Sequence, residues 1–345
     1  MKKVLIIGPN FRYFTHSIAQ SFEQTGWQTS TIQYDAPIHP YNTANKIRFK
    51  IAKIKHSWKE KVLTNNRIKN SQYAIAEFDK LQPDLVFIIN SDYLLPTAIQ
   101  HFKKTAYVAI WLYDDIRKFE FALNNLPLAD IIFCYDKSDV ELLQEKYHIN
   151  AHFLPQGAET ALYYPIENTP KTYDISFAGD IWNSPRRIHI LQTIVRTFPN
   201  LKIKIYGIYK PWYKNFFAWL TRERKDIYTN HNTTPQELNL LYNQSRIVLN
   251  IHGADDEQEH YRANPRFFEI LASGAYQICD NVPYVRDLFL NGEIGLYNNT
   301  DELIELIKDA LQNNPSVQKA HQEIMKNHTL QKRIEHALAI INQTM

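Results

Sequence analysis

Three short polar segments follow apolar runs in the sequence and carry residue types that suit anion binding or catalysis. The first is FAGD at 177–180, with SPRR after it at 184–187. Serine suits a helix N-cap and proline the first helical position, so the pattern predicts a helix with Arg186 and Arg187 in its first turn. Gly179 lets the backbone approach a ligand, and a helix N-terminus with guanidinium groups binds anions. The segment therefore predicts an anion site, with ordinary surface arginines as the alternative.

The second segment is NPRFFEILASG at 264–274. Asn264 suits an N-cap and Gly274 a C-terminal stop, so the sequence bounds a short helix at both ends. Arg266 and Glu269 stand three residues apart and share one face of this helix. They form either an ion pair worth roughly 0.3 kcal/mol, or a ligand site. In a ligand site Arg266 holds a phosphate group and Glu269 accepts hydrogen bonds from a ribose.

The third segment is WLYDD at 111–115, in which Asp114 and Asp115 follow an apolar run. A carboxylate at such a position can take a proton from an attacking hydroxyl group, or it can cap a helix that begins at Ile116. Other polar residues at predicted loop positions are Asn10, His16, Asp92, Asn250 and His252. Metal ligation finds little support, because the sequence has no Cys pair, no His-Glu-x-x-His and no two Asp separated by one residue.

Alternating strand and helix patterns must position these segments. Apolar strand candidates alternate with amphipathic helix candidates, which is typical of a parallel sheet covered on both faces. The predicted strands are VLIIG at 4–8, then 85–89, 106–112, 131–134, 173–178, 201–206, 247–251 and 276–279, and the predicted helices are 17–25, 96–103, 138–147, 185–196, 236–243 and 265–272. A stretch with Pro and Gly at 154–171 interrupts the alternation. We therefore expect two α/β domains with a cleft between them, covering 1–158 and 159–325, and a C-terminal helix at 326–345 that packs back on the first domain.

Positive charge is concentrated in one part of the chain. The net charge is +3, but the segment Lys46 to Lys69 holds nine Lys or Arg residues against Glu60 alone. Ile47, Ile51, Ile54, Trp58 and Val62 form one apolar stripe at helical spacing, with cations on the other faces. This insertion, 44–70, is predicted either to lie on an anionic membrane surface or to pack on its own domain. A second basic and aromatic stretch at 209–225 favours the membrane modestly, and no recognition module for nucleic acid is present.

Composition favours an ordinary folded protein of the cytoplasm. Hydrophobic residues make up 44% and charged residues 22% of the 345-residue chain, which excludes fibrous and disordered classes. The only two cysteines, Cys134 and Cys279, both end apolar runs, which suits buried reduced thiols better than disulfides. The first apolar run is too short for a signal peptide, and no run approaches the roughly 18 residues of a membrane span.

These motifs resemble the GT-B glycosyltransferases, in particular the CgeB-like (spore maturation protein type, group-1-like) branch. The resemblance covers the whole chain and rests on the WLYDD segment, LPQGAE at 154–159, FAGD with the two arginines, LYNQSRIVLNIH at 241–252 and RFFEILASGAYQICD at 266–280. It implies two Rossmann-like domains facing a central cleft, with the nucleotide-sugar donor bound by the second and the acceptor by the first. It also implies that no divalent metal or other cofactor is required.

Carried over by motif, the resemblance assigns the donor diphosphate and ribose to residues of the second domain. The expected donor-binding set is Gly179, Arg186, Arg187, Asn250, His252, Asn264, Arg266 and Glu269, with Glu269 at the ribose and Arg266 also catalytic. Asn10, His16 and Asp92 are expected on the acceptor side. Many retaining members of the family carry a second Glu eight residues before the ribose Glu, where this chain has Tyr261. Direct displacement with Asp114 or Asp115 as base therefore stays open beside retention.

The resulting expectation is transfer of a sugar to a hydroxyl group of a cell-surface glycan or lipid-linked acceptor, in polysaccharide or lipopolysaccharide biosynthesis. The enzyme would work in the cytoplasm, with the basic insertion holding it on the inner membrane surface. Two other functions are left open. A sugar-nucleotide epimerase of the same fold would bind a similar donor without an acceptor, and a non-catalytic module would bind the nucleotide-sugar without turnover.

Overall fold

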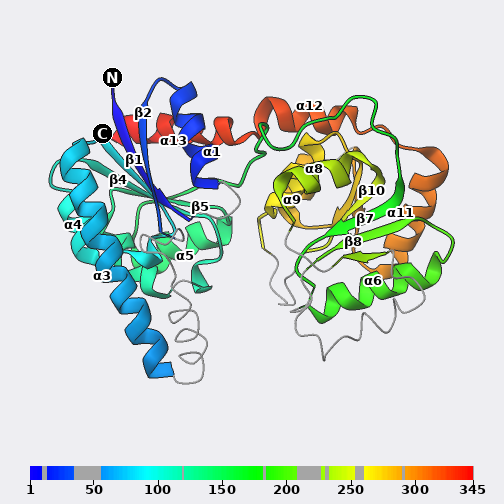
Figure 1. Cartoon of the computed structure of the whole chain (residues 1–345), viewed down its shortest axis with the longest axis horizontal. Helices are drawn as coiled ribbons and strands as arrows, with labels where there is room; N and C mark the ends of the chain where they lie inside the picture. Colours follow the sequence, from blue (N-terminus) through cyan, green and yellow to red (C-terminus); the bar gives the residue numbers. More distant parts are fainter. Residues whose placement is uncertain are drawn as a thin grey trace. The chain divides into compact units, whose positions relative to one another are not determined.

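The computed structural model describes residues 1–9, 14–34, 56–118, 120–181, 184–207, 227–229, 233–252, 260–289 and 292–344. The chain forms two compact units (Figure 1). The first consists of Met1–Pro155 together with Leu330–Met345, and the second consists of Gln156–Thr329. The division after Pro155 lies three residues before the position expected from the sequence, and the last helix belongs to the first unit.

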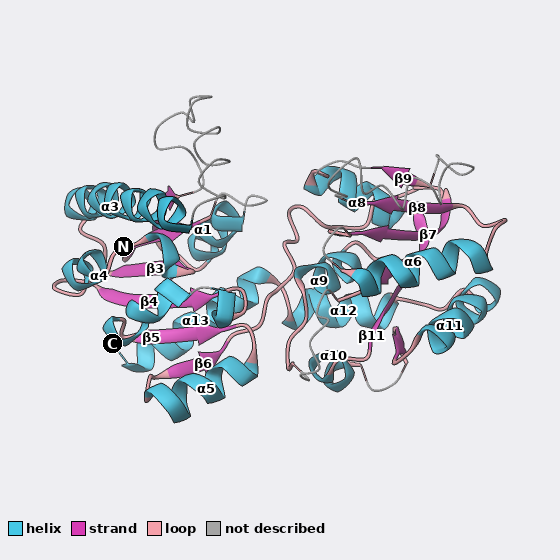
Figure 2. Cartoon of the chain, turned by 90° about the horizontal axis from the view of Figure 1, so that it is seen from below, coloured by secondary structure: helices cyan, strands magenta, loops and turns pink. Residues whose placement is uncertain are grey.

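The first unit contains one parallel sheet in the strand order β2-β1-β3-β4-β5-β6. Its strands are β1 (Lys3–Gly8), β2 (Gln28–Gln33), β3 (Leu85–Ile89), β4 (Tyr107–Leu112), β5 (Ile131–Cys134) and β6 (Ala151–Phe153). Its helices are α1 (Phe14–Gln24), α3 (His56–Leu81), α4 (Pro96–Phe102), α5 (Lys137–Tyr147) and α13 (Leu330–Thr344), with 3-10 turns η1 (Ser91–Tyr93), η2 (Ile116–Lys118), η3 (Glu120–Asn124) and η4 (Leu126–Leu128). Figure 2 shows β3, β4, β5 and β6 side by side in this order.

Both faces of this sheet are covered by apolar side chains, as the continuous apolar strand sequences require. On one face, Phe78 of α3 and Phe102 of α4 pack with the strands in one core. On the other face, Phe22 of α1 and Ile334 of α13 pack in a second core. The last helix therefore completes the first unit, and the Nε1 atom of buried Trp111 donates to the Leu154 carbonyl at 3.0 Å, where the chain leaves the unit.

The second unit contains a second parallel sheet in the order β12-β11-β10-β7-β8-β9. Its strands are β7 (Tyr173–Ala178), β8 (Ile203–Tyr206), β9 (Tyr228–Thr229), β10 (Ser245–Asn250), β11 (Gln277–Asp280) and β12 (Gly295–Tyr297). Its helices are α6 (Pro185–Thr197), α8 (Pro235–Asn243), α9 (Pro265–Ala272), α10 (Pro283–Leu288), α11 (Thr300–Asn313) and α12 (Gln318–Asn327). Helices α6 and α11 supply Ile190, Leu191, Leu303 and Ile307 to a core with the strands.

The predicted alternation is confirmed, and the strands that it missed have polar or very short sequences. The 14-residue helix α11 was also missed, although its sequence is amphipathic. The edge strand β2 reads QTSTIQ and has no apolar run that sequence patterning could detect. Strands β6, β9 and β12 are two or three residues long. Each lies at or next to an edge of its sheet, where one neighbour suffices and an apolar signature is not required.

The basic insertion overlaps helix α3, which begins at His56 among the described residues and continues to Leu81. The stripe residues Ile47, Ile51 and Ile54 lie outside the described residues, as does the stretch 209–225. The expectation that the cations of this helix lie on solvated faces is wrong for Arg67, which is 5% exposed. Its Nε donates to the Asp92 carbonyl at 2.9 Å, and its guanidinium carbon lies 3.6 Å from the centre of the Phe121 ring.

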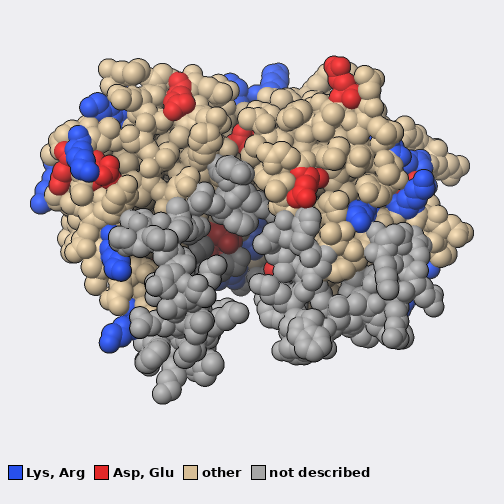
Figure 3. Space-filling model, in the orientation of Figure 1, with Lys and Arg blue, Asp and Glu red and all other residues tan. Residues whose placement is uncertain are grey.

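Charge over the described part of α3 is mixed. Glu77 accepts from Lys80 at 2.7 Å, and Asp79 contacts His101 of α4 at 2.7 Å. Figure 3 shows basic and acidic side chains intermixed over α3 and α4 on the face that it draws. Six of the nine basic residues counted in the sequence, Lys46 to Lys59, lie in the part whose side chains are not described. Among the described helices, none is long and apolar enough to cross a membrane.

Candidate functional site

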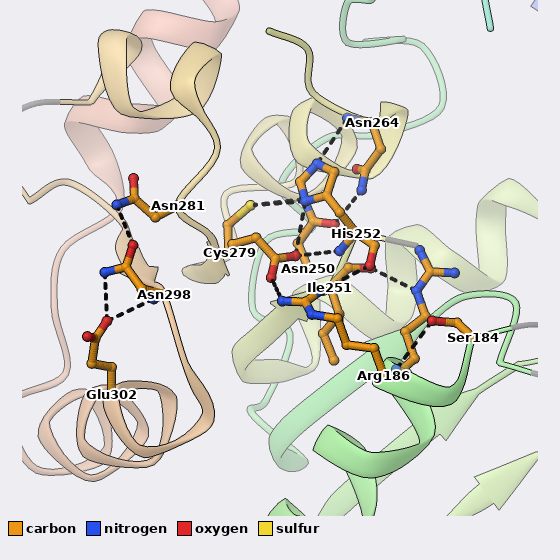
Figure 4. A network of polar contacts seen from close by, with 12 residues as sticks. Ser184, Arg186, Asn250, Ile251, His252, Asn264, Cys279, Asn281, Asn298 and Glu302 are labelled. Carbon is orange, nitrogen blue, oxygen red and sulfur yellow. Dashed lines mark hydrogen bonds and ion pairs between the residues drawn. The ribbon is translucent and has the colours of Figure 1, made fainter. Parts of the chain in front are cut away.

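The carboxyl ends of three neighbouring strands in the second unit bring the predicted segments together. Strand β7 is followed by Gly179, β10 ends at Asn250, and β11 ends at Asp280. In parallel sheets this edge is where ligands bind. Helices α6 and α9 also begin here, so two helix N-termini meet the strand ends (Figure 4).

Backbone packing is tight at Gly179. A Cβ atom added there would lie 2.7 Å from the ring of Phe177, and one added at Gly207 would lie 2.6 Å from the Gly179 carbonyl oxygen. Both positions therefore require glycine for lack of space, rather than for an unusual backbone angle. The close approach holds the loop after β7 against the loop after β8.

The start of α6 forms as predicted and directs a half-buried arginine along the strand ends. The hydroxyl group of Ser184 accepts from the Arg187 amide at 3.3 Å, which caps the helix. Arg187 donates from Nε to the Ile251 carbonyl at 2.9 Å and from Nη1 to the Asp180 carbonyl at 2.7 Å. Burial, and then the charge of Arg266, lower the pKa of Arg187 to about 10. It stays cationic at neutral pH, but it is poorly solvated, and a bound anion would stabilise it.

The start of α9 also forms as predicted. The Asn264 side chain accepts from the Phe267 amide at 3.1 Å and donates to the Asn250 side chain at 2.9 Å. Gly274 follows the helix with a φ of +67°, the left-handed conformation that a C-terminal stop requires. Asn250 is 1% exposed, so it supports the cap of α9 from inside the fold.

Arg266 and Glu269 lie one helical turn apart near this start. The Nε atom of Arg266 is buried and has no hydrogen-bond partner in the part of the chain that the structure describes. Its positive charge contributes to the lowered pKa of Arg187. Glu269 is 7% exposed, so its carboxylate is buried beside this cation. The arrangement concentrates positive charge beside one acidic group.

Asp280 joins the two helix starts. Its carboxylate accepts from the Arg186 guanidinium, from the His252 amide at 2.5 Å and from His252 Nδ1 at 3.1 Å. Arg186 also donates to the His252 carbonyl at 3.2 Å. Burial alone would raise the pKa of Asp280, but the hydrogen bonds from His252 and Arg186 outweigh it and hold that pKa well below its usual value. The same carboxylate outweighs burial at Arg186 and raises the pKa of that guanidinium.

Sequence reasoning did not single out Asp280 or Gln277. Gln277 is fully buried and donates to the Phe267 carbonyl of α9 at 3.1 Å. A signal for Asp280 was present, because it follows directly after the apolar run Tyr276 to Cys279 at the same sheet edge as the other polar loops. Burial and partners, which decide its role, are not visible in that pattern.

In the first unit, the two predicted carboxylates follow β4 and differ in their contacts. Asp115 is 5% exposed and accepts from the Arg117 amide and Nε, both at 2.9 Å, and from Arg117 Nη2 at 2.5 Å. It therefore caps the turn η2, which was the structural alternative considered for it. Asp114 is half-buried, and its Oδ1 accepts from the Asp115 amide at 2.9 Å.

The three residues expected on the acceptor side are not joined by hydrogen bonds or ion pairs among the described residues. His16 is exposed on α1, and no hydrogen bond or ion pair in the described part joins it to Asp92. Asp92 lies 3.7 Å from Arg67 Nη2, and burial raises its pKa, which the charge of Arg67 offsets only in part. Asn10 lies outside the described residues. In the described ranges, no group of three or more His, Cys, Asp or Glu side chains is arranged to hold a metal ion.

Comparison with known proteins gives a family match over part of the chain and a likeness of fold over nearly all of it. Residues 186–339 match the family model described as "Glycosyl transferase-like". No curated protein matches the sequence significantly. Sucrose-phosphate synthase from Thermosynechococcus elongatus superposes with a TM-score of 0.69 at 11% identity over 99% of both chains. HepE from Anabaena, solved in complex with UDP, gives 0.62 at 10% identity over 99% of this chain and 100% of that one. The UDP-GlcNAc 2-epimerase from Methanocaldococcus jannaschii gives 0.57 at 12% identity over 99% and 100%.

At such low identities the shared feature is the fold, two six-stranded parallel sheets with flanking helices. The family match begins at Arg186, so it includes the ends of β10 and β11 and the start of α9, but neither the end of β7 nor the Ser184 cap of α6. The chain therefore has the GT-B fold of two Rossmann-like domains, and its residues 186–339 carry the sequence pattern of the glycosyl transferase-like family.

Proposed function

We propose that the protein is a glycosyltransferase that moves a sugar from a nucleoside-diphosphate sugar to an acceptor hydroxyl group, and that it belongs to the CgeB-like branch. The observation that carries the proposal is the convergence of Arg187, Arg266 and the N-termini of α6 and α9. Breaking the bond between the sugar and the diphosphate leaves negative charge on the leaving group. Fixed guanidinium groups and helix N-termini stabilise that charge most where water is scarce.

Glu269 is proposed to bind the ribose of the donor. It follows Arg266 by one helical turn, so one short helix presents a cation for the diphosphate and an acceptor for ribose hydroxyl groups. A buried carboxylate accepts two such hydrogen bonds well, because charge-assisted bonds are about twice as strong as neutral ones. The diphosphate charge would then be met by side chains and helix ends without a divalent metal.

Asp114 is the proposed base for direct displacement. It would take the proton of the acceptor hydroxyl while the oxygen bonds to the sugar carbon and the bond to the diphosphate breaks. Asp115 suits this role less, since Arg117 already engages both of its oxygens. Tyr261, which stands where many retaining relatives have Glu, donates to Asp287 at 2.8 Å. Burial, and then that hydrogen bond, raise the pKa of Tyr261 to about 12, so it supplies no negative charge at neutral pH.

The experiment that tests donor binding is a thermal-shift panel of UDP, GDP, CMP and dTDP sugars. A ligand at 100 times its Kd stabilises the folded state by about 2.7 kcal/mol, which corresponds to roughly 5–10 °C for a unit of this size. We expect one nucleotide class to give such a shift, and the Arg246→Ala variant to keep it. Arg246 pairs with Asp174 at 3.3 Å at the opposite, amino end of β10 and so serves as the control. No shift with any nucleotide would contradict the proposal.

Product analysis separates transfer from the other functions of this fold. The likeness to a UDP-GlcNAc 2-epimerase motivates the comparison. An epimerase converts the donor without an acceptor, whereas a glycosyltransferase releases nucleoside diphosphate and requires the acceptor for sugar transfer. A thermal shift without turnover on any acceptor would instead indicate a binding module. Asn10, His16 and Asp92 stay candidates for contacts with a glycan or lipid-linked acceptor.

The insertion 44–70 is proposed to hold the enzyme on the cytoplasmic face of a membrane, near a lipid-linked acceptor. Its Lys and Arg residues other than the buried Arg67 supply the positive charge, at about 1 kcal/mol per residue near an anionic surface. We expect co-sedimentation with anionic vesicles that decreases at high salt and with Lys50→Glu, Lys53→Glu and Lys55→Glu combined. The exposed Lys308 of α11 provides the control, Lys308→Glu. Binding that resists both salt and charge reversal would contradict this role.

A further inference from the structure

Asp280 is almost fully buried beside the arginines of α6 and α9. Its side chain is 8% exposed, whereas the Arg186 side chain that it contacts is 34% exposed. Removing a buried carboxylate from such a site would increase the positive charge available to an anion. If charge alone determined binding, the Asp280→Asn change would therefore strengthen the binding of a diphosphate.

The contacts of His252 connect Asp280 to the start of α9. Nδ1 of His252 faces the Asp280 carboxylate, which only accepts, and Nε2 faces the Asn264 amide at 3.4 Å, which only donates. The neutral imidazole with its proton on Nδ1 satisfies both neighbours. Cys279 Sγ lies 4.0 Å from the same Nδ1 atom (Figure 4). The His252 ring thus contacts both Asp280 at the end of β11 and Asn264, the capping residue of α9.

Asn264 in turn fixes the first turn of α9. Its amide faces His252, its Nδ2 donates to Asn250, and its Oδ1 accepts from Phe267. Arg266 lies between Asn264 and Phe267 in this turn. On the other side of Asp280, Arg186 is held in the first turn of α6. One carboxylate is therefore linked to the arginine-bearing turns of both helices.

We propose that Asp280 and His252 are positioning residues, which hold the α6 and α9 arginines in place for the diphosphate of the donor. This inference rests on the proposed function. The negative charge of Asp280 weakens anion binding, but its contacts hold the arginine side chains in place before the anion binds. This second effect is the larger one, because ordering a mobile guanidinium group on binding costs conformational entropy.

The test measures binding of inorganic pyrophosphate and of UDP and GDP by calorimetry, with wild-type protein and Asp280→Asn. We expect Asp280→Asn to bind about tenfold more weakly, the loss typical of one charge-assisted hydrogen bond. The matched control is Asp174→Asn, because Asp174 also pairs with an arginine of the second unit, but at the amino end of its sheet. That variant should bind as the wild type does.

Two His252 variants separate positioning from folding. A Gln side chain reaches the position of Nε2 and can accept from Asn264, whereas an Asn side chain reaches only the position of Nδ1 and can donate to Asp280. We expect His252→Gln to retain most of the affinity and His252→Asn to lose about as much as Asp280→Asn. A role limited to stability would lower the melting temperature of both variants without this difference in binding.

The outcomes distinguish this inference from the proposed function. Wild-type protein that binds the probes, together with equal or tighter binding by Asp280→Asn, overturns the positioning role and leaves the proposed function intact. If the Asp280→Asn variant fails to fold, the two His252 variants decide the question. Equal affinity of His252→Gln and His252→Asn for the probes then overturns the positioning role. Wild-type protein that binds none of the probes overturns the proposed function and this inference together. Binding with the expected losses, but no sugar transfer, overturns only the proposed function.

Discussion

The carboxyl edges of the two sheets have the same backbone plan and opposite chemistry. In the second unit, the described residues at this edge include Arg186, Arg187 and Arg266 together with two buried acids, Asp280 and Glu269. In the first unit, the segments after β4 and β5 carry four acids: Asp114, Asp115 and Asp136 in loops, and Asp139 in the first turn of α5. Parallel strands supply the position in both units, and a few side chains decide whether the edge suits an anion or a hydroxyl group that must lose a proton.

Most of these four acids in the first unit accept hydrogen bonds from backbone amides of nearby turns and helix starts. Asp136 caps α5 by accepting from the Ser138 amide at 3.1 Å, and Asp139 accepts from the Ile116 amide at 3.3 Å. Asp115 holds Arg117. In the second unit the guanidinium groups are instead crowded, since Arg266 lowers the pKa of Arg187. The lowered pKa of Arg187 indicates that a bound anion would stabilise this guanidinium at the edge of the second sheet.

The largest effect on turnover is expected from Asp114→Asn, which tests whether the carboxylates at the carboxyl edge of the first sheet take part in catalysis. Loss of a general base lowers kcat by about 100- to 10,000-fold, without a matching change in donor affinity. Steady-state assays of Asp114→Asn and Asp115→Asn, made separately, measure it. Asp130→Asn is the control, because Asp130 accepts from the Val108 amide at 2.8 Å at the amino end of the same sheet. Near-normal turnover in both Asp114→Asn and Asp115→Asn would instead favour a reaction that retains the configuration of the sugar and uses no protein base.

A somewhat smaller effect is expected from Arg266→Ala at the cationic edge. Removing a fixed donor from the leaving group costs about 100-fold in kcat. Because the pKa of Arg187 is lowered in part by the charge of Arg266, the same change raises the pKa of Arg187 above about 10. Steady-state assays beside Arg246→Ala test this, and unchanged turnover in Arg266→Ala would remove the helix start from the mechanism.

Glu269→Gln should act on binding rather than on turnover. The change removes the charge of the proposed ribose contact but keeps its shape, so we expect about tenfold weaker nucleotide binding at nearly constant kcat. Titration calorimetry with the nucleotide identified in the panel measures the affinity. Glu305→Gln, an exposed change on α11, is the control. Equal affinities for wild type and Glu269→Gln would assign the ribose to other residues.

The smallest expected effect concerns stability in acid. The folded pKa of Asp280 lies below its unfolded value near 3.8, so its contribution is present above about pH 4 and is lost as the pH falls further. Asp280→Asn should lower the unfolding free energy of the second unit by about 2–3 kcal/mol at pH 7, and by less near pH 3. Urea unfolding at both pH values tests this, with Asp174→Asn as the reference. An equal loss of unfolding free energy at pH 7 and pH 3 would contradict the lowered pKa of Asp280.

The helix starts could be predicted because their signals are local. Ser184 with Pro185, and Asn264 with Pro265, occupy the N-cap and first helical positions in the structure as the sequence indicated. Capping depends on hydrogen bonds within three residues, so neighbours in the sequence determine it. The shared face of Arg266 and Glu269 follows from the helical repeat in the same way.

The role of Arg67 could not be predicted, because its partners are distant in the sequence. On a basic helix it reads as a solvated cation, yet Asp92 and Phe121 bury it against its own unit. Asp280 is a second case, since its partners Arg186 and His252 lie 94 and 28 residues away.

By itself, the sequence determined the alternation of strands and helices, the caps of α6 and α9, and the polar character of the loops at the strand ends. These depend on short-range hydrogen bonding and on the periodicity of apolar residues. Only the tertiary structure decided which charges are buried and with which partners, so that Asp115 caps a turn while Asp280 holds Arg186 and His252. The physical reason is that the energy of a charge depends on its solvation and on neighbours that only the folded chain brings together.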